Sequence, residues 1–184
     1  MGNALKLDTS SLQLVMEQEA IELLKWWQVH MLDTENGGFY GRRTVDNQLV
    51  PKAPKSIILN TRILWAFSAA ARFFKKEAYC LVANRAFGYL VTHFWDPVQA
   101  GLYWSLSADS SLLDAKKQVY AQAFGIYAFS EYYRLSNSIK AKSLALELFD
   151  LLEMHAKDTL KGGYFEAFGR NWEEWMTFAS VKRT

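Results

Sequence analysis

Three histidines are the side chains in this sequence best suited to moving protons, because imidazole titrates near neutral pH. They are His30, His93 and His155, and each lies three residues before an aspartate. A catalytic base occurs once in a site, whereas a residue that recurs in one slot of every repeat serves the scaffold. We therefore interpret the histidines as structural: they close helix C-termini, where a cation suits the helix dipole, or they hydrogen-bond the following turn.

Arg62 is a candidate for the opposite reason. It lies in the almost uncharged segment 57–65, and its counterpart one repeat later is Phe124, so the scaffold does not require a charge at this position. A guanidinium inside a protein is costly unless it is paired or faces a wet cavity. A structural salt bridge or a snorkelling surface residue would also explain Arg62, but we favour an arginine that faces a cavity and acts there.

Tyr120 and Trp104 are the candidate ligand-contacting residues. Tyr120 and Gln122 open an apolar helical segment, and a phenol at a helix start on an inner ring can bond a polar ligand; packing explains Tyr120 about as well. Trp104 occupies a position after a repeat glycine that varies between repeats, where a ligand surface would be built. We predict that Trp104 stacks on a sugar ring, although the seven tryptophans could also simply fill a core.

An internal repeat positions all of these residues. Its landmarks are an aspartate and a glycine that recur at intervals of 63 and 62 residues: Asp33, Asp96 and Asp158, with Gly38, Gly101 and Gly163. A second landmark, Ala66-Phe67-Ser68, returns 62 residues later as Ala128-Phe129-Ser130. Because two independent landmarks share one period, we interpret the chain as helix–turn–helix repeats of about 62 residues.

The helices of each repeat differ in character. From Leu12 to Met31 the apolar residues form one helical stripe opposite a polar face, which predicts an outer helix. Segments 57–74 and 119–135 are apolar nearly all round, which predicts buried inner helices. We therefore predict an all-α toroid of two concentric helical rings, with short β-hairpins at the glycine turns on one rim.

The count of repeats predicts half a barrel. We expect a single incomplete domain over residues 1–184, with units at about 8–74, 75–135 and 136–184. The third unit has an outer helix at 138–155 and a turn, but its inner helix would begin only near residue 182. Such an open half-ring leaves apolar inner helices without partners, so we expect it to self-associate.

Composition excludes several other classes of protein. A net charge of +2 with no basic stripe argues against a nucleic-acid partner, and Cys80 alone excludes an internal disulfide or a multi-cysteine metal site. The start of the chain lacks the pattern of a secretory signal, and the apolar stretches fall short of the ~20 residues of a membrane span. We expect a cytoplasmic protein without metal or other cofactor and without a membrane partner.

Six segments resemble the N-acylglucosamine 2-epimerase family, and within it the cellobiose 2-epimerases: residues 36–41, 61–68, 101–104, 117–124, 130–133 and 162–167. The resemblance implies an (α/α)6 barrel of about twice this length. It also implies epimerisation at C2 of the reducing-end sugar of a disaccharide such as cellobiose. In this chemistry one histidine removes the C2 proton, a second returns it, and an arginine stabilises the enediolate oxygen. Arg62 stands where the family has that arginine, and Tyr120 where it has a tyrosine near the substrate.

The resemblance stops before the acid–base residues. The family's catalytic histidines lie in the third inner helix and beyond, and none of the three histidines here matches one. Residues 175–184 do not fit the family's loop, whereas codons read one base out of frame permit it, so we hypothesise a frameshift near Glu174. We therefore expect an inactive N-terminal fragment. The alternatives are an N-acylglucosamine 2-epimerase acting on an N-acyl hexosamine, an aldose–ketose isomerase of the same fold, or a non-catalytic helical-repeat binding remnant.

Overall fold

The computed structural model describes residues 9–173, and contacts divide the chain into two compact units, Met1–Leu32 and Asp33–Thr184. The described part of the first unit is mainly helix α1 (Thr9–His30), where the sequence predicted the first helix. None of its side chains is buried, and Leu12, Met16 and Leu23 of the predicted apolar stripe are exposed. The helix is therefore confirmed, and Met31 at the end of the predicted stripe is buried; burial of the rest of the stripe stays a prediction.

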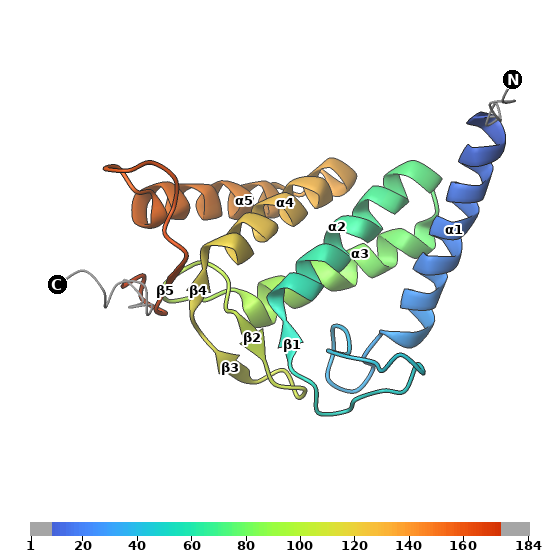
Figure 1. Cartoon of the computed structure of the whole chain (residues 1–184), viewed down its shortest axis with the longest axis horizontal. Helices are drawn as coiled ribbons and strands as arrows, with labels where there is room; N and C mark the ends of the chain where they lie inside the picture. Colours follow the sequence, from blue (N-terminus) through green and yellow to red (C-terminus); the bar gives the residue numbers. More distant parts are fainter. Residues whose placement is uncertain (1–8, 174–184) are drawn as a thin grey trace, which may run out of the picture. The chain divides into compact units, whose positions relative to one another are not determined.

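Two apolar helices run side by side in the second unit, α2 (Ile57–Phe74) and α4 (Val119–Ser136) (Figure 1). Both match the predicted inner helices. α2 begins where Ser56 Oγ accepts a hydrogen bond from the Leu59 amide at 3.2 Å, and it ends at Lys75, whose left-handed φ of 56° stops the helix. Trp65 of α2 stacks on Tyr127 of α4, with ring centroids 4.8 Å apart.

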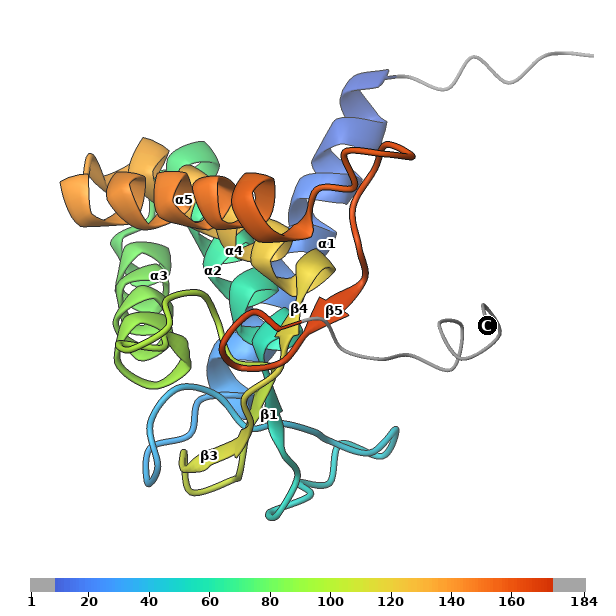
Figure 2. The same cartoon turned by 90° about the vertical axis from the view of Figure 1, so that its left-hand side faces the viewer.

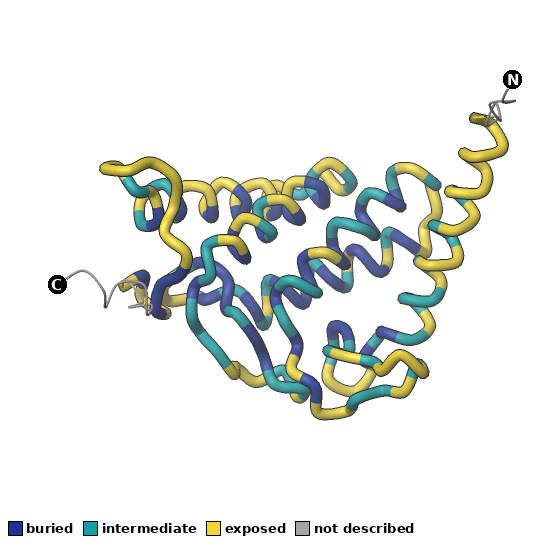
Figure 3. Tube along the Cα trace, in the orientation of Figure 1, coloured by how far each residue is buried: buried dark blue, intermediate teal, exposed yellow. Residues whose placement is uncertain are grey.

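Each inner helix carries an outer helix on its flank: α3 (Glu77–Tyr89) packs on α2, and α5 (Ile139–Leu151) packs on α4. Each outer helix continues into a wider π-helical turn, η1 (Leu90–Phe94) and η2 (Leu152–Ala156). In Figure 3 the buried residues of α5 follow the side toward α4, and exposed residues follow the other side. The predicted third outer helix is thus confirmed, and the matching π turns show the 62-residue period in three dimensions.

Short antiparallel strands join one repeat to the next. The strands are β1 (Lys55–Ser56), β2 (Ser105–Leu106), β3 (Leu112–Asp114), β4 (Lys117–Gln118) and β5 (Ala167–Phe168). They form the sheets β1-β2-β3 and β4-β5, with Ser56 opposite Ser105 and Gln118 opposite Ala167. Figure 2 shows β4 beside β5. The strand before each inner helix therefore pairs with the hairpin segment of the following unit, and this confirms the hairpins predicted near the glycine turns.

The length and apolar composition of α2 would allow it to cross a membrane, yet half of it is buried, as expected of a core helix. The order α1–α2, α3–α4, α5 agrees with the three predicted repeat units. The prediction of one domain over residues 1–184 stays a prediction. The proposed start of a third inner helix and the hypothetical frameshift near Glu174 lie outside the described residues.

Candidate functional site

The repeat aspartates build the three turns. In each turn the aspartate Oδ1 accepts hydrogen bonds from the amides two and three residues later, at 2.9–3.1 Å. The aspartate amide in turn donates to the carbonyl of the repeat glycine. The residues concerned are Asp33, Asp96 and Asp158, with Gly38, Gly101 and Gly163. The side chain thus replaces backbone partners in a tight turn, which is a scaffold role.

Two buried lysines, which the sequence interpretation missed, neutralise the first two of these aspartates. Lys55 Nζ lies 2.7 Å from Asp33 Oδ2, and Lys117 Nζ lies 3.2 Å from Asp96 Oδ2. All four side chains are at most 2% exposed. The lysines are 62 residues apart, in phase with the aspartates, and this spacing was the signal available in the sequence.

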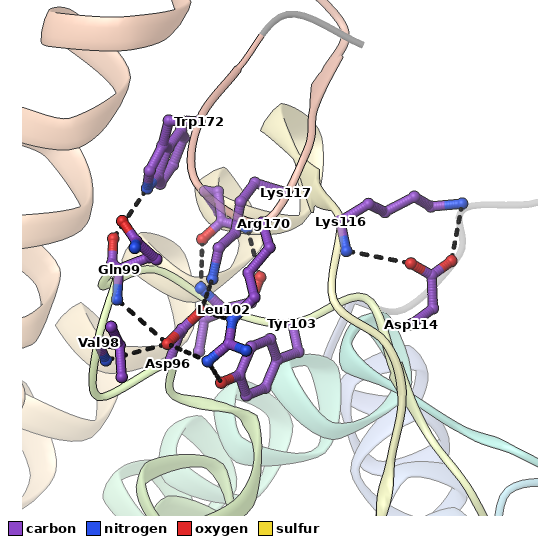
Figure 4. A network of polar contacts seen from close by, with 11 residues as sticks. Asp96, Val98, Gln99, Leu102, Tyr103, Asp114, Lys116, Lys117, Arg170 and Trp172 are labelled. Carbon is purple, nitrogen blue, oxygen red and sulfur yellow. Dashed lines mark hydrogen bonds and ion pairs between the residues drawn. The ribbon is translucent and has the colours of Figure 1, made fainter.

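Asp96 also binds Arg170 of the third unit, through contacts of 2.9 Å to Nε and 3.2 Å to a terminal nitrogen (Figure 4). Burial alone would raise the pKa of Asp96, but the hydrogen bonds from Arg170 and the turn amides, with the charge of Lys117, hold it well below its usual value. Burial lowers the pKa of Lys117 to about 8, although Asp96 opposes this shift. The cluster is a structural joint between repeats.

The three histidines lie in the last turn of their helices, as predicted, and each contacts an aromatic ring. The ring centroids are 5.2 Å apart for His30 and Trp26, 4.6 Å for His93 and Tyr89, and 5.1 Å for His155 and Trp172. Burial, with the nearby charge of Lys55, lowers the pKa of His93. These settings favour the structural interpretation of the histidines.

Arg62 projects from α2 as an exposed side chain and makes no hydrogen bond or ion pair with residues 9–173. A salt bridge within the described part of the chain therefore does not explain it. Its counterpart Phe124 lies at the equivalent position of α4, so the two residues occupy matching places on the paired inner helices. The catalytic role of Arg62 stays a prediction.

A row of aromatic rings runs from the hairpin along α4 to α2. Successive ring centroids are 4.8–6.3 Å apart, and the rings are those of Trp104, Tyr120, Phe124, Tyr127 and Trp65. Tyr120 and Tyr127 are about half exposed, at 49% and 47%. Lys116 Nζ lies 5.1 Å from the centroid of the Trp104 ring. We call these five residues the aromatic row; it brings two predicted site residues, Tyr120 and Trp104, into contact and leaves ring surface open to a ligand.

Gln122, in contrast, does not face outward. It is fully buried, and its side-chain amide binds the backbone of Leu102 twice: Oε1 accepts from the amide at 2.7 Å, and Nε2 donates to the carbonyl at 2.9 Å. The counterpart in the first unit, Asn60, is one methylene shorter, and its Oδ1 has no hydrogen-bond partner. Gln122 therefore holds the hairpin against α4 and is not a ligand contact.

Within residues 9–173, no group of three or more His, Cys, Asp or Glu side chains is arranged to hold a metal ion.

The sequence profile of the family described as N-acylglucosamine 2-epimerase (GlcNAc 2-epimerase) matches residues 2–180. The chain belongs to the N-acylglucosamine 2-epimerase family. This confirms the family resemblance.

Two cellobiose 2-epimerases and one further solved structure are similar to this chain. It is 46% identical over 162 residues to the cellobiose 2-epimerase of Bacteroides fragilis, covering 88% of this chain and 41% of that one. The structure of the cellobiose 2-epimerase from Bacillus thermoamylovorans B4167 superposes with a TM-score of 0.84 at 40% identity. The match covers 89% of this chain and 42% of that one. A D-mannose isomerase structure superposes with a TM-score of 0.79 at 22% identity, and the match covers 95% of this chain and 42% of that one. At this identity the likeness shows the fold alone.

The chain therefore spans about two-fifths of the length of the family members it matches. The predicted fold class, helix pairs of an (α/α)6 barrel present in part, is confirmed by these neighbours.

Proposed function

We propose that this chain is the N-terminal part of a sugar 2-epimerase that acts on the reducing-end sugar of a disaccharide such as cellobiose. The observation that carries the proposal is the combination of Arg62 and the aromatic row on neighbouring helices of a chain 46% identical to a cellobiose 2-epimerase. An exposed cation on α2 and open ring faces along α4 are residue types that can bind a sugar and stabilise negative charge.

Arg62 would act on the enediolate oxygen. Removing the C2 proton of an open-chain aldose places negative charge on an oxygen, and a guanidinium there lowers the barrier by stabilising that charge. Arg62 keeps its donors available because residues 9–173 do not use them. Tyr120 would bond a sugar hydroxyl from the start of α4, and Trp104 would stack on a sugar ring.

The acid–base histidines would come from outside residues 1–173. The three histidines present have aromatic neighbours at helix ends, and no family acid–base role maps onto them. We therefore expect the 184-residue chain to show no turnover of cellobiose.

The first experiment is an assay of the purified chain with cellobiose, with formation of glucosyl-mannose as the readout. Measurable epimerisation would contradict the proposal that the acid–base histidines lie outside residues 1–173. A non-catalytic binding module is distinguished by the second experiment: a chimera that joins residues 1–173 to the remaining C-terminal part of the B. fragilis enzyme. Epimerisation by the chimera is expected; an inactive but folded chimera would favour the binding remnant.

Within an active chimera, Arg62→Gln tests the role of the cation. We expect kcat to fall by about a hundredfold or more, as for the loss of one oxyanion-stabilising donor, while the unfolding temperature stays unchanged. Arg42→Gln is the matched control, because Arg42 is an exposed arginine outside the inner helices. Equal effects of the two variants would refute a catalytic role for Arg62. Substrate panels of cellobiose, an N-acyl glucosamine and mannose separate the three family activities.

A further inference from the structure

The first glycine hairpin meets its inner helix differently from the second. In the second unit the side-chain amide of Gln122 binds both backbone groups of Leu102, at 2.7 Å and 2.9 Å. The corresponding residues of the first unit are Asn60 and Phe39, which are 0% and 1% exposed. Within residues 9–173, neither the amide nor the carbonyl of Phe39 has a hydrogen-bond partner, and Asn60 Oδ1 has none either. Three buried polar groups therefore face this junction, and buried polar groups in proteins are normally paired.

The other end of the Asn60 amide fixes its orientation. Nδ2 donates to the carbonyl of Ser56, one turn earlier in the chain, at 2.8 Å. Because a carbonyl only accepts hydrogen bonds, exchanging the amide nitrogen and oxygen would lose this contact. The atom that stays unpaired is thus an oxygen, and the junction needs a donor for it.

The buried ion pairs place both hairpins at the same position along their inner helices. Lys55 lies five residues before Asn60, and Lys117 lies five residues before Gln122. Each lysine binds the aspartate of the turn that carries the hairpin, at 2.7 Å in the first unit and 3.2 Å in the second. The hairpin backbone is therefore fixed relative to the inner helix in the same way in both units.

The loop of the following unit covers both turns as well. Ser110 Oγ donates to the carbonyl of Asn36 at 2.7 Å, and one repeat later Trp172 Nε1 donates to the carbonyl of Gln99 at 3.0 Å. Both turns are thus held from two sides. The second unit is consequently a valid template for the distance between Asn60 and Phe39.

One methylene sets that distance. Glutamine is longer than asparagine by one carbon–carbon bond of about 1.5 Å, so the contacts that Gln122 makes become separations of about 4–4.5 Å at Asn60. This is too long for a direct hydrogen bond. It matches two polar groups that each bond at about 2.8 Å to one shared atom.

The three groups specify the chemistry of the shared atom. The Phe39 amide donates, whereas the Phe39 carbonyl and Asn60 Oδ1 accept. A cation would leave the amide without an acceptor, and an anion would leave both oxygens without a donor. A water molecule accepts one hydrogen bond and donates two, and about three hydrogen bonds are usual for a buried water.

We propose that one buried water molecule binds between Asn60 of α2 and the backbone of Phe39. The water takes the place that the amide of Gln122 fills in the second unit. The first hairpin is then held to α2 by an exchangeable molecule, two residues before Arg62, whereas the second is held to α4 by a side chain. This site goes beyond the proposed epimerisation and does not depend on it.

Cross-relaxation between amide and water protons, measured by NMR on the isotope-labelled 184-residue chain, tests the site. We expect the Phe39 amide to show a peak to a long-lived water. The Leu102 amide is the internal control and should show none, because Gln122 binds it directly. Absence of the peak at Phe39, or peaks of equal strength at both amides, would overturn the proposal.

Asn60→Gln adds the methylene that the first unit lacks. The longer side chain should bind Phe39 directly and displace the water, so the peak should disappear while the amide stays protected from hydrogen exchange. Nearby hydroxyl groups are unchanged in this variant, so a peak that they relay would persist, and persistence would contradict the proposal. Gln122→Asn is the matched opposite change and should create a water peak at Leu102.

A high-resolution crystal structure of the unsubstituted chain provides a test that needs no variant to fold. We expect density for one water within about 3.2 Å of the Phe39 amide, the Phe39 carbonyl and Asn60 Oδ1. A direct contact between Asn60 and Phe39, or no density between them, would refute the site. None of these measurements involves turnover, so an inactive chimera would count against the proposed function alone.

Discussion

Lys117 and Asp96 form an ion pair without solvent exposure, and one repeat earlier Lys55 and Asp33 form its counterpart. Each lysine lies two residues before an inner helix, and each aspartate holds a turn that follows an outer helix. The pairs therefore fix the glycine turn of a repeat to the start of the inner helix in the same repeat. Buried pairs do not by themselves imply high stability, but breaking one leaves a buried charge without a partner.

Asp96→Asn tests this relationship while keeping an oxygen acceptor for the turn amides. We expect the free energy of unfolding to fall by about 3–5 kcal/mol, because the buried Lys117 ammonium loses its counter-charge. Urea unfolding followed by circular dichroism measures the loss. Asp114→Asn is the control: its pair with Lys116 is partly exposed, and its loss should cost less than about 1 kcal/mol. Equal losses would show that burial of the pair is not what matters.

Acid should destabilise the second unit through the same aspartates. Burial raises the pKa of Asp33 and Asp96, but hydrogen bonds and the facing lysines outweigh it, so both folded-state pKa values lie below the ordinary value of 3.8. Their stabilising contribution is present above that value and is lost as the pH falls toward the folded-state pKa values. Unfolding free energies measured from pH 6 to pH 3 should decrease, and less steeply in Asp96→Asn. Parallel pH profiles for the two proteins would contradict this origin.

Alanine substitutions at the repeat glycines separate backbone strain from close packing. Gly101 and Gly163 both have a φ near 80°, so each substitution should cost about 1–2 kcal/mol of strain. At Gly101 the new Cβ would also lie 2.8 Å from the Trp172 ring, which must move. We therefore expect Gly101→Ala to lower the unfolding temperature clearly more than Gly163→Ala. A reversed order in thermal unfolding would show that Trp172 does not pack on this turn in solution.

Gln122→Leu removes the amide that holds Leu102. The buried amide and carbonyl of Leu102 would lose their partners, each at a cost of about 1–3 kcal/mol. Asn60→Leu is the matched change in the first unit. There the side-chain oxygen has no protein partner, and the only protein hydrogen bond lost is that from Nδ2 to the Ser56 carbonyl at 2.8 Å, so the cost should be smaller. Chemical denaturation of both variants measures the difference. A larger loss for Asn60→Leu would mean that these equivalent positions do not differ as the hydrogen bonds indicate.

Much of the helical framework could be predicted from the sequence, since burial patterns along a helix are local. The apolar segment 57–74 coincides with α2, and the segment 119–135 ends one residue short of α4. Gln122 starts the same helix as Tyr120 but faces the other way: residues two apart on a helix are rotated by about 200°, so Gln122 and the exposed Tyr120 cannot share a face. Lys55 and Lys117 were missed because a lysine beside an apolar helix usually lies in solvent.

The sequence by itself determined the 62-residue period, the inner and outer helices and the glycine turns, because these depend on spacing along the chain. Only the tertiary structure decided which repeated residues meet across units: the buried lysine–aspartate pairs, the Gln122 contact with Leu102, the aromatic row and the coverage of each turn by the next loop. Apart from the neighbouring rings along α4, these contacts join residues 16 to 74 positions apart, and no local pattern specifies burial or hydrogen-bond partners at that range.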